Sequence, residues 1–470
     1  VFALMWVGAV PVVLDPGLGL RKLLKCIAHT RPEALVGIAP ALLLRRAFPR
    51  SFQSVRVALR IEGRRFEGAL EAARKGQKLP EPFVSGGQTP AAVLFTSGST
   101  GPAKGAVYTH GMFAAQLNLV RNTYGIEPGE VDFPMLPVFA LFNPALGMTT
   151  VVPPMNPARP AKADPGQLVE AMRRHGVTNS FGSPAVWMLI AAHCEATGEH
   201  LPGLRRILAA GAPVTPQLLE RLRALAPHAL VHTPYGATEV LPVSTIAAET
   251  VTRETAGRTS QGAGTCVGKP LAGVCVRILR LPEGVAPHWS AAEEAETGSI
   301  GEIAVHAPQM TREYDNLAEA TARSKTTGPD GRLYHRMGDM GYCDAAGRLW
   351  FCGRRAERVE KDGNVFYTDC VENIFNTHEA VSRCALIGLG PAGAHKPALV
   401  VEPSADKYPK TGGARRILAE KLRTHGRERL PGLALEHVFF RKRLPVDVRH
   451  NAKIHRLSLK AEYDRKEGRT

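Results

Sequence analysis

A short apolar run leads directly into a loop of small, hydroxylated and flexible residues, and this junction constrains the fold more than any other feature. The run is AAVLF at 91–95, and the loop is TSGSTGPAKG at 96–105. Flexible linkers do not normally follow a buried strand, so we expect an ordered turn here. Gly98, Gly101 and Gly105 let the backbone turn tightly and present its N–H groups inward. The pattern predicts a strand followed by a phosphate-binding loop.

The side chains of this loop also suit an anion. Its lysine, Lys104, adds a mobile positive charge. Hydroxyl donors come from Thr96, Ser97, Ser99 and Thr100. The loop is not a Walker A motif, which needs Gly directly before the Lys and a hydroxyl directly after it. Here Ala103 precedes the lysine and Gly105 follows it, so a different phosphate-binding loop is indicated.

The order of apolar and amphipathic stretches favours an α/β fold. A helix is predicted over TPQLLERLRALAP, with Thr215 as its cap and leucines at helical spacing. From about residue 265 the sequence pattern changes to one typical of strand–turn–strand units. After residue 353 the sequence is more charged, and its pattern predicts a small α+β unit. We expect a large domain of layered α/β subdomains with a β-rich segment at 1–353, and a small mobile domain at 354–470.

The first residues, VFALMWVGAVPVVLDPG, form an apolar run that is shorter than the ~20 residues that span a bilayer. The run lacks a basic start, so it does not resemble a signal peptide. It predicts a buried strand that ends at the Asp-Pro-Gly turn and no transmembrane segment. A strand without a polar start also suggests that residues precede it in the natural chain.

The formal net charge is +16, which raises the question of nucleic acid. Basic residues cluster at 441–456 and 43–52, but they show no aromatic–basic interleaving of the RNA-binding type, and no DNA-binding motif is recognisable. We therefore expect no nucleic-acid partner; an anionic substrate or contact with a membrane surface fits the charge better. The eight cysteines show no CxxC spacing, which predicts a reducing, cytoplasmic setting and no metal site built from them.

The order of residues in TSGSTGPAKG resembles the signature loop of the adenylate-forming superfamily, which includes acyl-CoA synthetases, luciferases and the adenylation domains of peptide synthetases. Further stretches resemble the later motifs of that superfamily in the same order. They are AAGAP (209–213), YGATE (235–239), GTCVGKPLAGVCVRI (264–278), GSIGEIAVHAP (298–308), HRMGDMGYCDAAGRLWFCGR (335–354) and LPVDVRHNAKIHR (444–456). The resemblance covers nearly the whole chain.

The resemblance implies that a carboxylate reacts with ATP to give an acyl-adenylate and pyrophosphate. The loop at 96–105 would hold the β- and γ-phosphates, Thr238 would contact the α-phosphate, and Glu239 would hold Mg²⁺, for which a carboxylate is a suitable ligand. The adenine would be enclosed by Tyr235, Gly236, Gly211, Ala212 and Pro213.

The same resemblance assigns three charged residues. Asp339 and Arg354 match the residues that contact the ribose, and Lys453 matches the catalytic lysine that bridges the α-phosphate and the substrate carboxylate. Taken singly, an Asp after a Gly is usually a turn residue, and a Lys in a basic tail usually lies on the surface. As an ordered set they favour an active site.

The chain also departs from the common pattern. Ala452 replaces the glycine before the catalytic lysine, Ala356 replaces a frequent Asp or Lys at the hinge, and Ala140 replaces a frequent His beside the acyl group. With FALFNPALGMTT and PPMNPARPA, these features resemble the β-lactone synthetases of bacterial long-chain olefin biosynthesis. That branch adenylates a 2-alkyl-3-hydroxy fatty acid, and the β-hydroxyl then attacks the activated carbonyl, so no CoA is needed. It also implies other olefin-pathway enzymes as partners.

Several alternatives stay open. The chain is otherwise a long- or medium-chain fatty acyl-CoA ligase or an acyl-AMP ligase, a non-catalytic nucleotide- or lipid-binding relative, or, more distantly, a basic scaffold for nucleic acid. A base for the hydroxyl is not identified, although His450 and His455 lie near Lys453. Trp187 and Met188 either line an acyl tunnel or pack in a helical core.

Overall fold

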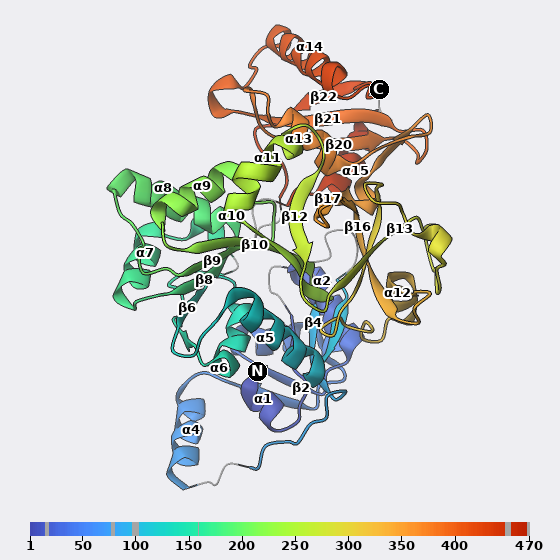
Figure 1. Ribbon diagram of the computed structural model, residues 1–470. Coiled ribbons are helices and arrows are strands. Elements are labelled where there is room, and N and C mark those ends of the chain that lie inside the picture. The colour runs from blue at the N-terminus through green and yellow to red at the C-terminus, as the bar shows by residue number, and fades with distance from the viewer. Residues whose placement is uncertain (15–17, 77–79, 96–102, 158, 447–452, 468–470) are drawn as a thin grey trace. The chain divides into compact units, whose positions relative to one another are not determined.

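The computed structural model describes residues 1–470 except 15–17, 77–79, 96–102, 158, 447–452 and 468–470. The chain divides into two compact units; Figure 1 labels their helices and strands. The first comprises residues 1–116, 238–240 and 308–323, and the second comprises 117–237, 241–307 and 324–470. Each unit mixes helices with strands, and the α/β class expected from the sequence is confirmed.

The first unit contains a small sheet that carries the glycine-rich loop. Its strands are β1 (Val12–Val13), β4 (Pro90–Phe95) and β5 (Gly105–Thr109). The strand predicted at 91–95 is confirmed, and Phe95 at its end pairs with Gly105 on the antiparallel neighbour. A Cβ on Gly105 would lie 2.7 Å from Cγ1 of Val93. This position therefore needs glycine, and the loop connects two adjacent strands.

The prediction for the N-terminal run is wrong over most of its length. Residues Phe2–Trp6 form a short helix, α1, and only Val12–Val13 form a strand, which lies parallel to β4. Phe2 is 50% exposed and Trp6 is 45% exposed, so the run is not buried. An apolar run without alternating polar residues does not distinguish a strand from a helix, and here the helix forms.

The rest of the first unit surrounds a second small core. Its elements are α2 (Leu20–Thr30), β2 (Ala34–Gly37), α3 (Ala39–Ala47), β3 (Val57–Arg60) and α4 (Arg64–Gly76). The strands β2 and β3 are parallel. Helix α5 (His110–Tyr124) follows β5.

The second unit is built on one long mixed sheet in the order β13-β14-β16-β17-β12-β11-β10-β9-β8-β6-β7, with β15 paired to β16. Its parallel part consists of β6 (Val131–Pro134), β7 (Thr149–Thr150), β8 (Asn179–Gly182), β9 (Arg206–Ala209) and β10 (Leu230–Ala237). The remaining strands are β11 (Val240–Ala247), β12 (Thr265–Pro270), β13 (Cys275–Leu279), β14 (Gly301–His306), β15 (Lys325–Thr327), β16 (Leu333–Cys343) and β17 (Leu349–Arg354).

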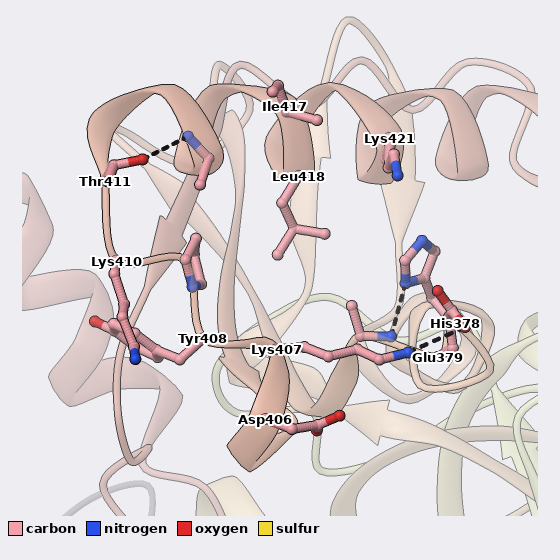
Figure 2. A pocket seen from close by; sticks show the side chains of 13 residues that line it. His378, Glu379, Asp406, Lys407, Tyr408, Lys410, Thr411, Ile417, Leu418 and Lys421 are labelled. Atoms are coloured by element: carbon pink, nitrogen blue, oxygen red, sulfur yellow. Dashed lines mark hydrogen bonds and ion pairs between the residues drawn. The ribbon is translucent and has the colours of Figure 1, made fainter.

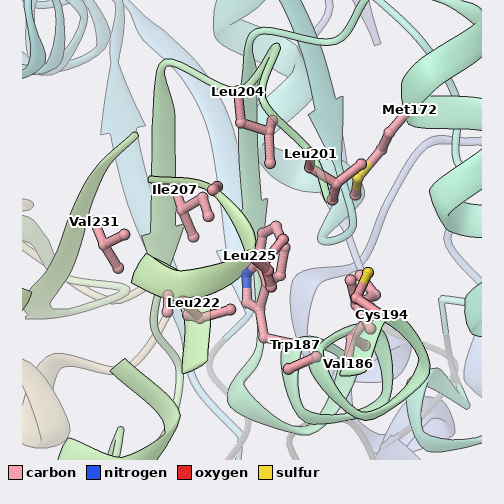
Figure 3. Close-up of a cluster of buried hydrophobic side chains, with 14 of the residues drawn as sticks. Met172, Val186, Trp187, Cys194, Leu201, Leu204, Ile207, Leu222, Leu225 and Val231 are labelled. Carbon is pink, nitrogen blue, oxygen red and sulfur yellow. The ribbon is translucent and has the colours of Figure 1, made fainter. Parts of the chain in front are cut away.

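Three helices cover the parallel part and form its main core with the strands, as Figure 3 shows. They are α7 (Pro165–Arg174), α8 (Pro184–Thr197) and α9 (Pro216–Leu225). Helix α9 begins as predicted, because Oγ1 of Thr215 accepts a hydrogen bond from the N–H of Leu218 at 3.3 Å. Its buried leucines are Leu218, Leu219, Leu222 and Leu225.

The two residues considered for an acyl tunnel, Trp187 and Met188, are neighbours in helix α8 but differ in burial. Trp187 is fully buried in this core, beside Leu222 and Leu225 (Figure 3). Met188 is 52% exposed. Core packing is therefore the structural role of Trp187.

The C-terminal residues form an α+β arrangement of the predicted kind. A sheet in the order β20-β21-β22 packs with three helices around two apolar cores. The elements are α13 (Thr368–Phe375), β20 (Val381–Leu389), β21 (Lys396–Pro403), α14 (Gly412–Arg429), β22 (His437–Phe440) and α15 (Arg456–Glu467). The boundary at 353 stays a prediction.

A groove of about 650 Å³ lies beside helix α14 (Figure 2). The helix is capped by Thr411, whose Oγ1 accepts from the N–H of Ala414 at 3.2 Å. Lys407 pairs with Glu379 at 3.0 Å, and Lys421 lies on the helix above. None of the predicted active-site residues lines this groove.

Candidate active site

The predicted nucleotide-binding residues of the second unit follow neighbouring strands of the parallel sheet. Gly211, Ala212 and Pro213 come directly after β9, and Tyr235 and Gly236 lie near the end of β10. These strands are parallel and adjacent, so both segments leave the sheet at its carboxyl edge. Ligands of open α/β sheets bind at this edge. Gly211 has φ +92°, a backbone conformation that favours glycine.

A hairpin brings Asp339 and Arg354 together. The two residues are paired across β16 and β17. The hairpin turns at Asp344, whose carboxylate accepts from the backbone N–H groups of Ala346 at 3.0 Å and Arg348 at 2.9 Å. Burial opposes ionisation of this carboxyl group, but the hydrogen bonds outweigh it and lower its pKa to about 2. The turn sets the pairing from Cys343 to Gly341, and an irregularity between Met340 and Gly341 then shifts the register so that Asp339 faces Arg354.

Tyr235 completes this cluster. Its hydroxyl donates to Oδ2 of Asp339 at 2.6 Å, and its ring lies 6.3 Å from that of Phe351 between centroids. Burial and the Asp339 charge raise the pKa of Tyr235 well above its ordinary value. The tyrosine therefore stays protonated and donates at neutral pH.

The other carboxylate oxygen of Asp339, Oδ1, lies near a positive charge but accepts no hydrogen bond from the described residues. Nη1 of Arg354 lies 2.9 Å from Oδ1, but its N–H does not point along a hydrogen bond. Oδ1 is buried and accepts no hydrogen bond from the described residues. A buried acceptor with a nearby positive charge and no donor suits a ligand hydroxyl, so Asp339 fits the predicted ribose contact.

The first unit contains a second cluster, around Thr238 and Glu239. These residues form the turn between β10 and β11 and belong to the first unit. The hydroxyl of Tyr108 donates to the backbone oxygen of Thr238 at 2.5 Å. The N–H of Thr311 donates to the backbone oxygen of Glu239 at 2.8 Å. The hydroxyl of Tyr314 donates to Oε1 of Glu239 at 2.5 Å.

Glu239 fits the role of a magnesium ligand. Glu239 is only 9% exposed. Across the described ranges it makes no ion pair, and no hydrogen bond reaches its Oε2. A buried carboxylate needs a compensating charge. A divalent cation bound by Glu239 would supply that charge, because carboxylate oxygens are preferred ligands of such ions.

Lys104 closes the glycine-rich loop beside this cluster. Its Nζ lies 4.9 Å from the centroid of the Tyr314 ring, a cation–π geometry. The other predicted loop residues, Thr96, Ser97, Gly98, Ser99, Thr100 and Gly101, lie outside the described residues.

Sequence reasoning missed two tyrosines. Tyr108 is 2% exposed and Tyr314 is 6% exposed, and both touch the turn that carries Thr238 and Glu239. Their distances along the chain from Glu239 are large, and no predicted motif contains them. Tyr108 could have been considered because it lies in β5, the strand that directly follows the glycine-rich loop. Nothing in the sequence marks Tyr314 in a comparable way.

Lys453 is half-buried and directly precedes Ile454, which forms an isolated bridge with Val446. Arg456, three residues on, begins α15 and pairs with two buried carboxylates, Glu372 at 2.5 Å and Glu357 at 3.0 Å. These contacts anchor the segment that carries Lys453. Its catalytic role stays a prediction. His450 and Ala452 lie outside the described residues.

Comparisons with known proteins identify the family of this chain. The family model of AMP-binding enzymes matches residues 1–315. The olefin β-lactone synthetase of Stenotrophomonas maltophilia (strain K279a) is 45% identical, over 97% of this chain and 83% of the relative. The olefin β-lactone synthetase of Xanthomonas campestris pv. campestris is 44% identical, over 97% of this chain and 82% of the relative.

A solved structure shares the fold. O-succinylbenzoate coenzyme A synthetase from Bacillus subtilis, in complex with ATP and a magnesium ion, matches with a TM-score of 0.72. It is 21% identical, and the match covers 98% of this chain and 86% of that chain. The chain therefore belongs to the AMP-binding, adenylate-forming enzymes, and within them to the branch of the ATP-dependent olefin β-lactone synthetases.

Proposed function

We propose that this enzyme activates a long-chain 2-alkyl-3-hydroxy fatty acid with ATP and closes it to a β-lactone. The observation that carries the proposal is the 45% identity, over 97% of the chain, to an olefin β-lactone synthetase. The two carboxylate clusters support it, because one suits a ribose and the other suits a divalent cation.

In the first step, an oxygen of the substrate carboxylate attacks the α-phosphorus of ATP, the bond to the bridging oxygen breaks, and pyrophosphate leaves. In this proposal Lys104 and the loop at 96–105 hold the departing phosphates, Thr238 contacts the α-phosphate, and Lys453 offsets the charge between the two reacting anions. Mg²⁺, when bound at Glu239, neutralises phosphate charge.

In this proposal the nucleoside is bound by the cluster of Tyr235, Asp339 and Arg354 in the second unit. Asp339 accepts from the ribose hydroxyls, Arg354 balances its charge, and Tyr235 holds the carboxylate from the other side. Gly211, Ala212, Pro213 and Gly236 enclose the adenine.

In the second step, the β-hydroxyl oxygen attacks the acyl carbon, the bond from that carbon to the phosphate oxygen breaks, and AMP leaves. The hydroxyl proton is released to a base or to solvent. The nucleophile is part of the activated molecule, so the enzyme gains the advantage of an intramolecular reaction once the chain is folded correctly. Water must be excluded, because it would hydrolyse the adenylate.

We also propose that residues 354–470 form a separate domain that carries Lys453, that the enzyme works in the cytoplasm, and that it associates with other enzymes of olefin formation. Among the described residues no helix is long and apolar enough to cross a membrane. Contact with a membrane surface is compatible with the net charge of +16.

The test is an incubation with ATP, Mg²⁺ and a synthetic 2-alkyl-3-hydroxy acid, with and without CoA, with products identified by NMR. We expect β-lactone, AMP and pyrophosphate without CoA. The matched control is the same acid without its hydroxyl group, which should give pyrophosphate exchange but no lactone. Strict dependence on CoA, with a plain fatty acid accepted, would show instead a fatty acyl-CoA ligase.

A further inference from the structure

Tyr314 lies where three parts of the first unit meet. Its hydroxyl donates to Glu239, its ring faces Nζ of Lys104, and its backbone forms an isolated bridge with Ala106 on β5. The side chain is 6% exposed and packs with Tyr108 and Met112. The same residue therefore contacts the predicted metal ligand and the end of the predicted phosphate loop.

We propose that Tyr314 is a positioning residue for the metal: it holds the Glu239 carboxylate by Oε1, presents Oε2 to Mg²⁺, and supports Lys104 beside it. This proposal rests on the assignment of Glu239 as the magnesium ligand in the proposed function. It assigns Tyr314 no contact with the substrate.

The backbone on both sides of the Glu239 side chain is already fixed by other residues. Tyr108 holds the oxygen of Thr238, and Thr311 donates to the oxygen of Glu239. What remains free is the set of side-chain torsions of the glutamate. The hydroxyl of Tyr314 restricts these torsions, and hydrogen bonds to a charged acceptor are the stronger ones.

Tyr314 is itself held firmly enough to act as a support. Its N–H donates to Oγ1 of Thr321 at 3.0 Å. The next residue, Asp315, donates its N–H to the oxygen of Gly105 at 2.8 Å, and Val107 donates to the oxygen of Glu313 at 3.2 Å. The segment is thus tied to the strand that begins where the loop ends. A shift of the loop end and a shift of Glu239 would both disturb the same tyrosine.

The decisive variant is Y314F, which removes the hydroxyl and keeps the ring under Lys104. Its matched control is Y334F, since Tyr334 is another buried tyrosine whose hydroxyl donates to a carboxylate, Asp330, at 2.7 Å. Nucleotide binding is measured by the thermal shift that a non-hydrolysable ATP analogue gives across a series of Mg²⁺ concentrations. No acid substrate is present, so the result does not depend on whether a lactone is formed.

We expect Y314F to need about 10-fold more Mg²⁺ for the half-maximal shift. Binding of the nucleotide without Mg²⁺ should be unchanged, and Y334F should resemble the natural protein. In an E239Q background, the effect of Y314F on Mg²⁺ should disappear, because the tyrosine acts through that carboxylate.

Equal Mg²⁺ requirements for Y314F and the natural protein, within twofold, would overturn the proposal. So would an undiminished effect of Y314F in the E239Q background. If Y314F does not fold, T321V provides the comparison. It removes the Thr321 hydroxyl that accepts from the backbone N–H of Tyr314, and it keeps the Tyr314 hydroxyl that donates to Glu239. A Mg²⁺ requirement raised about threefold then supports the proposal, and an unchanged one overturns it.

Discussion

Each of the two units contains a tyrosine that donates to a buried carboxylate, but the charges of the two carboxylates are balanced in different ways. In the second unit Tyr235 donates to Asp339 at 2.6 Å, and Arg354 lies 2.9 Å from the same carboxylate. In the first unit Tyr314 donates to Glu239 at 2.5 Å. No cation pairs with Glu239 in the parts of the chain that the structure describes.

This difference separates two kinds of ligand. A buried charge is costly unless it is paired. Asp339 has its counter-charge in the protein, so a neutral hydroxyl suits its open oxygen, Oδ1. Among the described residues, the Glu239 side chain has only a neutral hydroxyl as a partner, so a cationic ligand would supply its counter-charge. This difference supports our proposal that the ribose binds at Asp339 and the metal at Glu239.

The largest expected effect is that of E239Q. Glutamine keeps the shape and still accepts from Tyr314, but it removes the charge that a divalent cation needs. We expect ATP–pyrophosphate exchange to fall by about 100- to 1,000-fold, while the midpoint of thermal unfolding stays nearly the same. Exchange that falls less than about 3-fold would contradict the assignment of Glu239 as the metal ligand, because the cation would then be held elsewhere.

A smaller effect is expected for D339N. Asparagine at this position weakens the ribose contact and leaves Arg354 without its carboxylate, so we expect the KM for ATP to rise about 10-fold. The sharper measurement compares ATP with 2′,3′-dideoxy-ATP. The natural enzyme should prefer ATP, and D339N should lose most of that preference. A preference that D339N keeps in full would show that the ribose hydroxyls bind elsewhere.

How much of this site the sequence could reveal depended on where each side chain finds its partner. Thr215 and the leucines of α9 were predictable because cap and apolar stripe are local patterns. Asp339, Arg354 and Tyr235 were predictable from motif resemblance, and the hairpin and the hydrogen bond that join them appear only in the fold. The roles of Tyr108 and Tyr314 arise entirely from tertiary contacts, so no local pattern marks them.

At the N-terminal run, a local pattern was present but the secondary structure predicted from it was wrong. Its composition is apolar enough for a buried strand, but Phe2–Trp6 are helical and half-exposed. Hydrophobicity alone decided that prediction, and hydrophobicity without a period does not choose between helix and strand.

A third buried carboxylate, Asp369, extends this contrast. It forms no ion pair in the described part of the chain and has no predicted ligand, although the charge of Arg456 is near enough to lower its pKa. It accepts from Oγ1 of Thr265 at 2.8 Å and from Nδ2 of Asn373 at 3.0 Å. Burial raises its pKa from 3.8 to about 6, against the opposing effect of those hydrogen bonds. Asp369 thus illustrates the cost of burying a carboxylate. At Asp339 the neighbouring Arg354 offsets that cost, and at Glu239 the proposed cation would offset it.

We therefore expect D369N to leave ATP–pyrophosphate exchange nearly unchanged and to alter only the pH dependence of stability. Because the folded pKa is the higher one, ionisation of Asp369 disfavours the folded state. The penalty is absent below about pH 4, grows between about pH 4 and pH 6, and is complete above pH 6. Denaturant unfolding at pH 4.5 and pH 7 measures this penalty. The free energy of unfolding of D369N, relative to that of the natural protein, should be higher at pH 7 than at pH 4.5. A difference between the two proteins that does not change with pH would mean that Asp369 ionises as easily in the folded chain as in the unfolded one.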